Sequence, residues 1–279
     1  MYWLDSSELA AAAWTLGVAH SPGHPLAALL GRACALVPLG PIALKVGLAQ
    51  ALCGALAAAQ TARLGEHLAR RVRALSEGEP RPREDALLGA AAGLLFGLSW
   101  AAAFQAVRPE VYALSALLVI SCALELARFD ETGDRRHLYM GALWAGLALT
   151  NHHLLALAVV APGLLFVIAR RPKAPLARAI ARVFVAGALG LAVLVYLPLR
   201  AAHQPLVDWG APTTLGRLWW TVTAKAFQKA VAHAQAGSVP EVLAAVVEQL
   251  HLVGALLALG GGYVMLRRRG VRRLALFLL

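Results

Sequence analysis

Charged side chains are scarce in this sequence: they make up 15% of its 279 residues, whereas hydrophobic residues make up 59%. Soluble globular domains are usually about 25% charged and about 45–50% apolar. The apolar residues also fall in blocks of membrane length. The shortage of charge argues against a soluble protein and predicts an all-α fold, a polytopic bundle of transmembrane helices.

Several familiar motifs are absent. There is no Walker A loop, no dinucleotide-binding glycine motif, no GxSxG and no HExxH, so nucleotide-driven transport by this chain is not expected. The three cysteines stand alone in apolar segments, with neither metal-ligand spacing nor a disulfide framework. Tyr2, Trp3 and Asp5 follow Met1 without the basic leader and apolar core of a signal peptide, so we do not expect a cleavable one here. No basic stretch carries the interleaved aromatic residues of a nucleic-acid surface, so we expect no nucleic-acid partner.

Acidic residues are few beside basic ones, 15 against 26, and the formal net charge is +11. Most of the Lys and Arg residues fall in four short stretches that alternate with apolar blocks. Basic loops are typical of the cytoplasmic side of membrane proteins, so we predict that all four face the cytoplasm. The stretches are 63–85, 128–137, 170–182 and 267–273.

Seven apolar blocks are predicted to be spans, because about 20 helical residues cross the hydrocarbon core. Two blocks are short and flank the polar tip Asn151, His152 and His153. We interpret them as a hairpin whose tip lies inside the protein or in a wet cavity. The predicted spans are 41–62, 86–104, 111–128, 138–151, 153–169, 180–199 and 246–266, and an eighth would start at Leu274.

One predicted span carries a ridge of small residues. Gly89, Gly93 and Gly97 recur every four residues and so share one helix face. Such a ridge lets a neighbouring helix approach closely within a membrane. We therefore expect a tightly packed helix partner along this face.

The whole chain, 1–279, is predicted to be a single transmembrane domain. With the stretch 63–85 in the cytoplasm, alternate loops fall on the outer side, and these hold most of the unusual polar residues. The layout has an outer loop at 1–40 with interfacial helices near 7–18 and 25–37, six spans over 41–199 with outer connections at 105–110 and 151–153, an outer segment at 200–245, and truncated last spans at 246–279.

The outer loop at 1–40 holds the first candidate site residues. Asp5 and Glu8 are three apart and would share a helix face, so both carboxylates could serve one cavity as bases. Alternatively, Asp5 is an N-cap and Glu8 completes a capping box. His20 and His24 lie on a stiff turn rich in Pro and Gly, where they either bind a phosphate or sugar or are incidental surface residues.

Three further outer segments carry candidates. Arg108 and Glu110 lie where two spans meet, and Arg108 either offers a fork to a phosphate or anchors the helix at the interface. The tip Asn151, His152 and His153 is either a site or a solvated turn. In the long outer segment Arg200 and Asp208 are candidate substrate-binding residues, whereas Trp219 and Trp220 fit an interfacial belt and Lys225 and Lys229 fit lipid phosphates.

Together these pieces resemble a known family pattern. The run YWLDSSELAAAAWTLGVAHSPGHPLAALLG is similar to the opening signature of the protein O-mannosyltransferase-like membrane family, also known as domain of unknown function 2723. Ser7, Ser21 and His24 depart from the usual glycine, proline and tyrosine of that signature. Further matches are RPEVYAL at 108–114, LALTNHH at 147–153, and YLPLR followed by DWGAPTTL within 196–215.

That family is similar to the GT-C glycosyltransferases, and the resemblance implies an enzyme with an outer active site. Its donor would be a polyprenyl- or dolichyl-phosphate sugar, with mannose expected. The acceptor would be a hydroxyl, expected on a protein Ser or Thr although a glycan is open. The resemblance assigns the essential acidic position to Asp5, with Glu8 as its companion; no metal ligands are assigned, although a divalent metal stays open. An Ala- and Arg-rich composition favours a bacterial inner membrane with a periplasmic active face.

Two other functions remain as alternatives. A transporter or lipid flippase predicts broken helices and polar groups near the bilayer midplane. A non-catalytic membrane scaffold explains a truncated chain but not the acidic and histidine residues gathered outside. The sequence does not specify the sugar, the acceptor or the oligomeric state.

Overall fold

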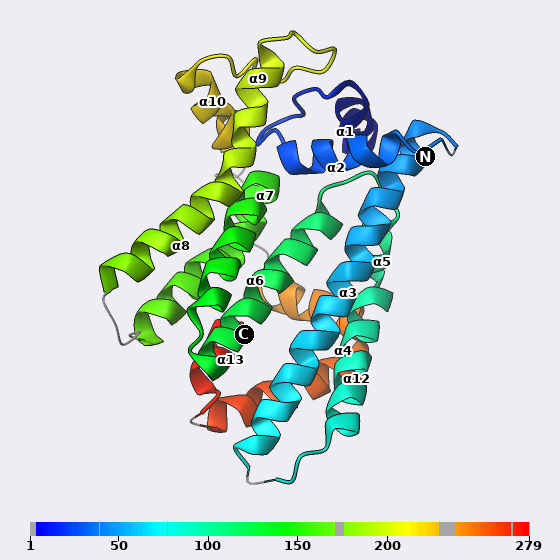
Figure 1. Ribbon diagram of the computed structural model, residues 1–279. Helices are drawn as coiled ribbons and strands as arrows, with labels where there is room; N and C mark the ends of the chain where they lie inside the picture. Colours follow the sequence, from blue (N-terminus) through cyan, green and yellow to red (C-terminus); the bar gives the residue numbers. More distant parts are fainter. Residues whose placement is uncertain are drawn as a thin grey trace.

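The computed structural model describes residues 4–38, 40–76, 78–170, 176–228, 238–268 and 270–278. These residues form an all-helical bundle with no strand among them, which confirms the predicted fold class. Figure 1 shows long helices side by side, with several of the short helices gathered at one end. The long elements are α3 (Ile42–Ala74), α4 (Pro82–Leu98), α6 (Tyr112–Thr132), α7 (Arg135–Arg170), α8 (Leu176–Leu191) and α12 (Val239–Arg267).

Helix α4 packs against α3 along the predicted glycine ridge. A Cβ atom on Gly89 would lie 2.5 Å from the carbonyl oxygen of Ala62, and one on Gly93 would lie 2.6 Å from that of Ala58. Both distances are far below van der Waals contact, so only glycine permits this approach. The ridge is therefore confirmed as a helix-packing surface.

Helix α7 contains the predicted hairpin. Its backbone leaves helical geometry at His152, where φ is −152° and ψ is 92°. Leu138 and Phe166 belong to one buried cluster, although a straight helix would hold them about 42 Å apart at 1.5 Å per residue. The two arms of α7 therefore fold back on each other, and the tip at 151–153 is confirmed.

The predicted count of seven to eight spans is not confirmed. By length and hydropathy four helices could each cross a membrane, or up to six segments if each bent pair counts as one span. One bent pair is α4 with α5 (Trp100–Ala106), at 65°. The other lies within α12, where Val239–Leu250 and Gly254–Arg267 meet at 108°. The predicted span 246–266 is therefore not straight, and Leu274 lies buried in the short helix α13 (Arg272–Leu278).

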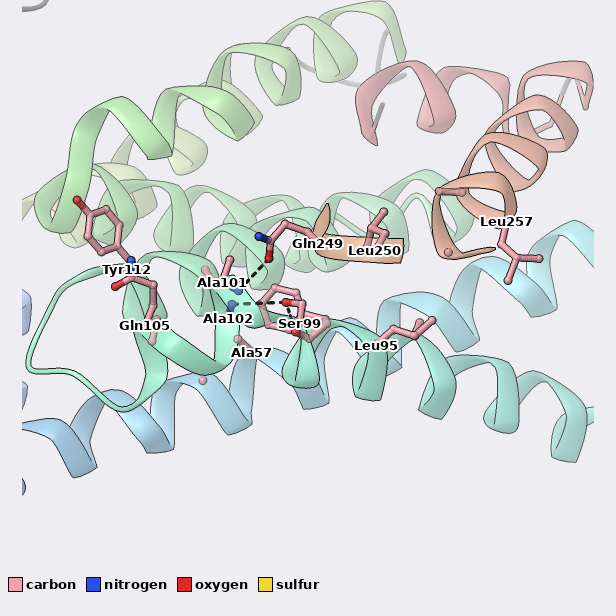
Figure 2. Close-up of a pocket in the computed structure, with 17 residues that line it drawn as sticks. Ala57, Leu95, Ser99, Ala101, Ala102, Gln105, Tyr112, Gln249, Leu250 and Leu257 are labelled. Atoms are coloured by element: carbon pink, nitrogen blue, oxygen red, sulfur yellow. Dashed lines mark hydrogen bonds between the residues drawn. The ribbon is translucent and has the colours of Figure 1, made fainter. Parts of the chain in front are cut away.

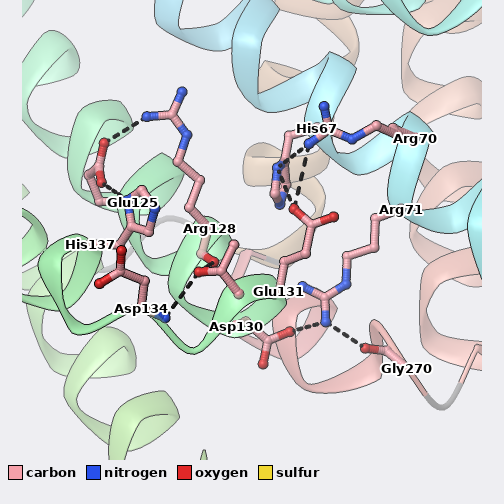
Figure 3. Close-up of polar contacts among 11 residues, drawn as sticks. His67, Arg70, Arg71, Glu125, Arg128, Asp130, Glu131, Asp134, His137 and Gly270 are labelled. Atoms are coloured by element: carbon pink, nitrogen blue, oxygen red, sulfur yellow. Dashed lines mark hydrogen bonds and ion pairs between the residues drawn. The ribbon is translucent and has the colours of Figure 1, made fainter. Parts of the chain in front are cut away.

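One end of the bundle gathers the basic stretches (Figure 3). Arg71 on α3 pairs with Asp130 on α6 at 2.5 Å and donates to the carbonyl of Gly270 at 3.2 Å. Glu131 on α6 lies 3.4 Å from His67 and 3.5 Å from Arg70. Three of the four stretches predicted to be cytoplasmic thus meet at one end, while much of the fourth, 170–182, lies outside the described residues.

The opposite end carries the first two helices and the short helices that follow α8 (Figure 1). Val18 and Asp208 form an isolated parallel bridge, in which the Val18 N–H donates to the carbonyl of Val207 at 2.7 Å. This bridge joins the first loop to the outer segment that follows the bundle. The elements are α1 (Leu4–Thr15), α2 (Pro25–Ala35), the 3₁₀ helix η1 (Ala192–Val195), α9 (Tyr196–Ala201), α10 (Leu215–Val222) and the 3₁₀ helix η2 (Lys225–Phe227).

Candidate functional site

A cavity of about 680 Å³ lies among these short helices and the α7 tip. Its volume is in the range of small-molecule sites in proteins. Of the predicted site residues, Asp5, Glu8, His20, His152 and His153 line it. The other lining residues are Ser21, Pro22, Leu154, Trp209, Thr223, Ala224, Phe227 and Gln228.

Asp5 and Glu8 lie on one face of α1, as their spacing predicts. Leu4 is already helical, which places Asp5 within α1 rather than at its N-cap. The Glu8 carboxylate accepts a hydrogen bond from the His20 backbone N–H at 2.6 Å and lies 3.3 Å from His20 Nδ1. The capping-box alternative is therefore wrong, because Glu8 turns toward the His20 loop.

Glu8 and His20 shift each other's pKa in opposite directions. Burial alone raises the pKa of Glu8, but the hydrogen bonds from the His20 ring and backbone outweigh it, and the net shift is downward. The hydrogen bond to Glu8 raises the pKa of His20 in spite of its partial burial. The pair therefore favours a carboxylate beside an imidazolium at the cavity wall.

His24 does not line the cavity, contrary to its predicted role in substrate binding. It is buried, and its Nδ1 lies 2.5 Å from the backbone carbonyl of Asn151. Burial lowers the pKa of His24 to about 3, so its ring is neutral and supplies no charge. Asn151 is likewise buried and donates to the carbonyl of Val111 at 2.9 Å and to Ser115 Oγ at 2.8 Å. These two residues tie the histidine turn to the α7 tip.

His152 and His153 follow Asn151 directly and do line the cavity. The His152 ring lies 6.1 Å from the His24 ring and 5.8 Å from the Tyr112 ring, between centroids. The backbone departs from helical geometry at this residue, and the reversal of α7 places both imidazoles at the end of the bundle. The hairpin tip therefore contributes two histidines to the site and uses its asparagine for structure.

Arg108 and Glu110 lie beside α1, which Glu110 contacts through Ser6, and they are not among the residues that line the cavity. Glu110 is buried and accepts hydrogen bonds from Ser6 Oγ at 2.6 Å and from Arg108 Nη2 at 3.1 Å. The Arg108 guanidinium also lies 4.7 Å from the centroid of the Phe104 ring, a cation–π contact. Arg108 thus contacts Glu110 and Phe104 outside the cavity lining, and its predicted role in phosphate binding stays a prediction.

Arg200 and Asp208 hold the outer segment to the first loop. Arg200 Nε donates to the carbonyl of Leu16 at 2.7 Å and Nη2 to that of Thr15 at 3.3 Å, so the guanidinium caps the end of α1. Burial raises the pKa of Asp208, while Arg217 opposes that shift. Neither side chain is among the residues that line the cavity, and their predicted contact with substrate stays a prediction.

Three residues of the site could hold a cation. Asp5, Glu8 and His20 each offer a ligand atom, and these atoms lie within 4.8 Å of one another. Carboxylate and imidazole groups together suit several divalent metals. Two of the three already pair with each other, so the same group also works as a hydrogen-bonded acid–base pair without an ion.

Sequence reasoning missed the wall formed by Thr223, Ala224, Phe227 and Gln228. These residues follow α10, and no local motif distinguishes them from an ordinary amphipathic segment. The Phe227 ring lies 6.2 Å from the His20 ring between centroids, more than 200 positions away in sequence. The Val18–Asp208 bridge, the Arg200 contacts and a hydrogen bond from the Tyr196 hydroxyl to the carbonyl of Gly17, at 2.9 Å, join the outer segment to the first loop.

Comparisons with known proteins identify relatives of this sequence. Residues 5–175 match the family described as the protein O-mannosyl-transferase TMEM260 N-terminal domain. The protein O-mannosyl-transferase TMEM260 of Mus musculus is 32% identical over 219 residues, which cover 76% of this chain and 29% of the relative. The chain thus spans less than a third of that relative's length. No solved structure matches.

Proposed function

This chain belongs to the TMEM260 N-terminal domain family, and from that premise we propose that it transfers mannose from a lipid-phosphate donor to a protein hydroxyl. The observation that carries the proposal is the cavity at the end of the bundle, with its carboxylates and imidazoles in one wall. Titratable groups gathered in a cleft and shifted by their neighbours are typical of active sites. The integral membrane setting suits a donor whose chain lies in the bilayer.

Asp5 is the general base of the proposed reaction. Its carboxylate is exposed at the cavity, whereas both oxygens of Glu8 face His20. The acceptor hydroxyl gives its proton to Asp5 as its oxygen bonds to the sugar's anomeric carbon. The bond between that carbon and the phosphate oxygen breaks, and the electron pair leaves with the lipid phosphate. General base catalysis of this kind contributes about 10²–10⁴-fold to a rate.

His20 faces the departing phosphate in this account. The hydrogen bond to Glu8 raises the pKa of His20 and so favours its cationic form. A charge-assisted hydrogen bond from imidazolium to a phosphate oxygen is among the stronger polar contacts. His152 and His153 line the same cavity and can donate or accept hydrogen bonds at the sugar.

The cavity opens on the non-cytoplasmic side in this proposal. The basic stretches that meet at the opposite end of the bundle support that orientation, since Lys and Arg favour the cytoplasmic side. We place the chain in a bacterial inner membrane, which its Ala- and Arg-rich sequence favours.

The proposal is tested by sugar transfer in membranes that contain the chain. Labelled polyprenyl-phosphate mannose is supplied with a Ser/Thr-containing peptide, and wild type is compared with Asp5→Asn. Glu79→Gln is the matched control, because Glu79 is an exposed carboxylate outside the cavity lining. Transfer by wild type and the control, but not by Asp5→Asn, is expected; equal transfer by all three chains contradicts the assignment.

One observation favours the transporter alternative and sharpens the test. The α4–α5 and α12 segments are bent by 65° and 108°, and broken helices are typical of transporters. The described lining of the 680 Å³ cavity, however, lies at one end of the bundle and not at these bends (Figure 1). Release of free polyprenyl phosphate with peptide labelling indicates transfer, whereas movement of intact donor across the vesicle wall indicates transport.

A further inference from the structure

The outer segment supplies one wall of the 680 Å³ cavity, and none of the side chains in this outer wall carries a charge. The carboxylates and imidazoles of the cavity come instead from α1, from the loop that follows it and from the α7 tip. The two groups of lining residues therefore differ in chemistry. The outer wall consists of Trp209, Thr223, Ala224, Phe227 and Gln228.

Backbone contacts fix the start of the outer wall over the first loop. The Trp209 N–H donates to the carbonyl of Val18 at 3.0 Å. Gly210 follows with a φ of 74°, and a Cβ atom there would lie 2.7 Å from Thr221 Oγ1. Glycine allows the chain to turn this closely onto α10. The outer wall is thus built on a turn that packs against both α10 and the first loop.

A second turn fixes Phe227 at the other end of the outer wall. Ala224 adopts left-handed geometry with a φ of 51°, and its carbonyl accepts a hydrogen bond from the Phe227 N–H at 2.9 Å. Gln228 Nε2 donates to the carbonyl of Thr223 at 3.3 Å, and the Gln228 amide also has an oxygen that can accept. The Phe227 ring is therefore held in place before a ligand binds, which lowers the entropy cost of binding.

The rings of Phe227 and His20 form a corner of the cavity. Their centroids lie 6.2 Å apart, and their planes are inclined by 88°. Phe227 remains 40% exposed, so part of its ring is open to a ligand. The hydrogen bond to Glu8 raises the pKa of His20, so the neighbouring ring favours a cationic form with N–H donors. The corner thus combines an apolar ring with a charged hydrogen-bond donor.

A pyranose ring suits this corner. Its faces carry C–H groups, which are attracted to the electron-rich face of an aromatic ring. Its hydroxyls lie around its edge and need hydrogen-bond partners. His152 and His153 line the same cavity and can supply such partners. A sugar would therefore use both the outer wall and the histidines.

A second cavity, of about 550 Å³, is lined differently. It lies between α3, α4, α5, α6 and α12, and Figure 2 shows alanine and leucine side chains around most of it. Among its polar groups, Gln249 Oε1 already accepts a hydrogen bond from the Ala101 N–H at 2.9 Å. Sugar hydroxyls would find few partners in this cavity, so the corner at Phe227 is the better sugar site.

We propose that the sugar of the lipid-phosphate donor stacks on the Phe227 ring, which makes Phe227 a specificity-determining residue of the proposed transfer. The inference rests on the proposed function, in which His20 faces the donor's phosphate. The donor's sugar is bonded directly to that phosphate, whereas a sugar or peptide of the acceptor lies beyond the bond that is broken. The short distance between the Phe227 and His20 rings therefore favours the donor's sugar.

The test is calorimetric binding to the full chain in nanodiscs, without any acceptor. Two ligands are compared, farnesyl phosphate mannose and farnesyl phosphate, so that the ratio of their Kd values isolates the contribution of the sugar. Phe227→Leu removes the aromatic face and keeps an apolar side chain, whereas Phe227→Tyr keeps the face. Trp219→Leu is the matched control, because Trp219 is an exposed aromatic residue of α10 outside the cavity lining.

Phe227→Leu is expected to raise the Kd of the mannose-bearing ligand about tenfold, a change of about 1.4 kcal/mol, and to leave the Kd of farnesyl phosphate unchanged. Phe227→Tyr and Trp219→Leu should keep the wild-type ratio. Equal losses for both ligands in Phe227→Leu would assign the ring to the fold or to lipid contact and overturn the inference. A ratio that Phe227→Leu leaves unchanged overturns it as well, and is the result expected if the outer wall binds the acceptor.

The binding ratio is independent of sugar transfer, so the two proposals fail separately. A ratio that depends on Phe227, without peptide labelling by wild type, removes the proposed transfer and keeps the sugar site. Peptide labelling by wild type, with a ratio that does not depend on Phe227, removes this inference alone.

Discussion

The two ends of the bundle both gather ionisable side chains, but they use them in opposite ways. At the basic end Arg71 and Asp130 pair directly, with side chains 13% and 7% exposed (Figure 3). At the other end Asp5, Glu8 and His20 line an open cavity of about 680 Å³. The Arg71–Asp130 pair joins two long helices, whereas Asp5 and the Glu8–His20 pair face a cavity and remain available for chemistry. The comparison distinguishes an ion pair that stabilises the bundle from charged residues of the candidate active site.

The largest expected effect on stability lies at the basic end. Asp130→Asn leaves the Arg71 guanidinium largely buried without its anion, which should cost about 3 kcal/mol. Thermal unfolding in detergent, followed by size-exclusion chromatography, measures the loss. Glu84→Gln is the control, since Glu84 is 51% exposed and exposed pairs contribute less than about 1 kcal/mol. Similar losses in both variants would mean that burial does not distinguish these ion pairs.

A smaller effect is expected where Arg200 caps α1. Arg200→Met removes two hydrogen bonds to the carbonyls of Thr15 and Leu16 and should cost about 1–2 kcal/mol. Amide hydrogen exchange at 16–18 should speed up, because the loop loses its tie to α9. Arg217→Met serves as the control, since Arg217 is an exposed residue whose hydrogen bond to the carbonyl of Ala211 is long, at 3.5 Å, and lies away from residues 16–18. Unchanged exchange in Arg200→Met would contradict the capping role.

The smallest effect is a pH dependence of the Glu8–His20 pair. The pKa of His20 is raised above 6.5, so its contribution to stability is full below pH 6.5 and is lost as pH rises through the raised value. The pKa of Glu8 is lowered below 4.5, so its contribution is present above pH 4.5 and is lost as pH falls through the lowered value. Both contributions coexist between pH 4.5 and 6.5.

Glu8→Gln should therefore lower the melting temperature most in that window and progressively less as the medium becomes alkaline. Melting curves of wild type and variant from pH 4 to 9 measure the difference. His203→Gln, which changes an exposed histidine of the outer segment away from Glu8, is the control. A deficit of Glu8→Gln that stays constant across the whole range would contradict a protonation-linked pair.

Local patterns in the sequence were enough to predict part of this structure. The glycine ridge and the α7 tip follow from periodicity and from three polar residues between short apolar blocks. The shared position of Asp5 and Glu8 on one face of α1 follows from helical spacing. In each case the signal is local: the residues that form the pattern lie within a few helical turns of one another, so a single sequence reveals it.

Other features depend on contacts between distant segments. Arg108, Arg200 and His24 are residue types that bind phosphate or sugar. In this structure each makes a hydrogen bond within the protein: Arg108 to Glu110, Arg200 to the carbonyl of Leu16, and His24 to the carbonyl of Asn151. Phe227 reaches His20 only because the outer segment crosses the first loop. A single sequence does not specify such partners, and it did not reveal the bend in α12 either.

The most direct test compares Asp5→Asn and Asp130→Asn in one transfer assay, at a temperature where both remain folded. The account predicts that Asp5→Asn loses at least about 100-fold in rate with an unchanged melting temperature, as expected for loss of a general base. It predicts that Asp130→Asn melts earlier but retains the wild-type rate per folded molecule. Retained transfer by Asp5→Asn, or loss of transfer by folded Asp130→Asn, would contradict the division of roles between the two ends.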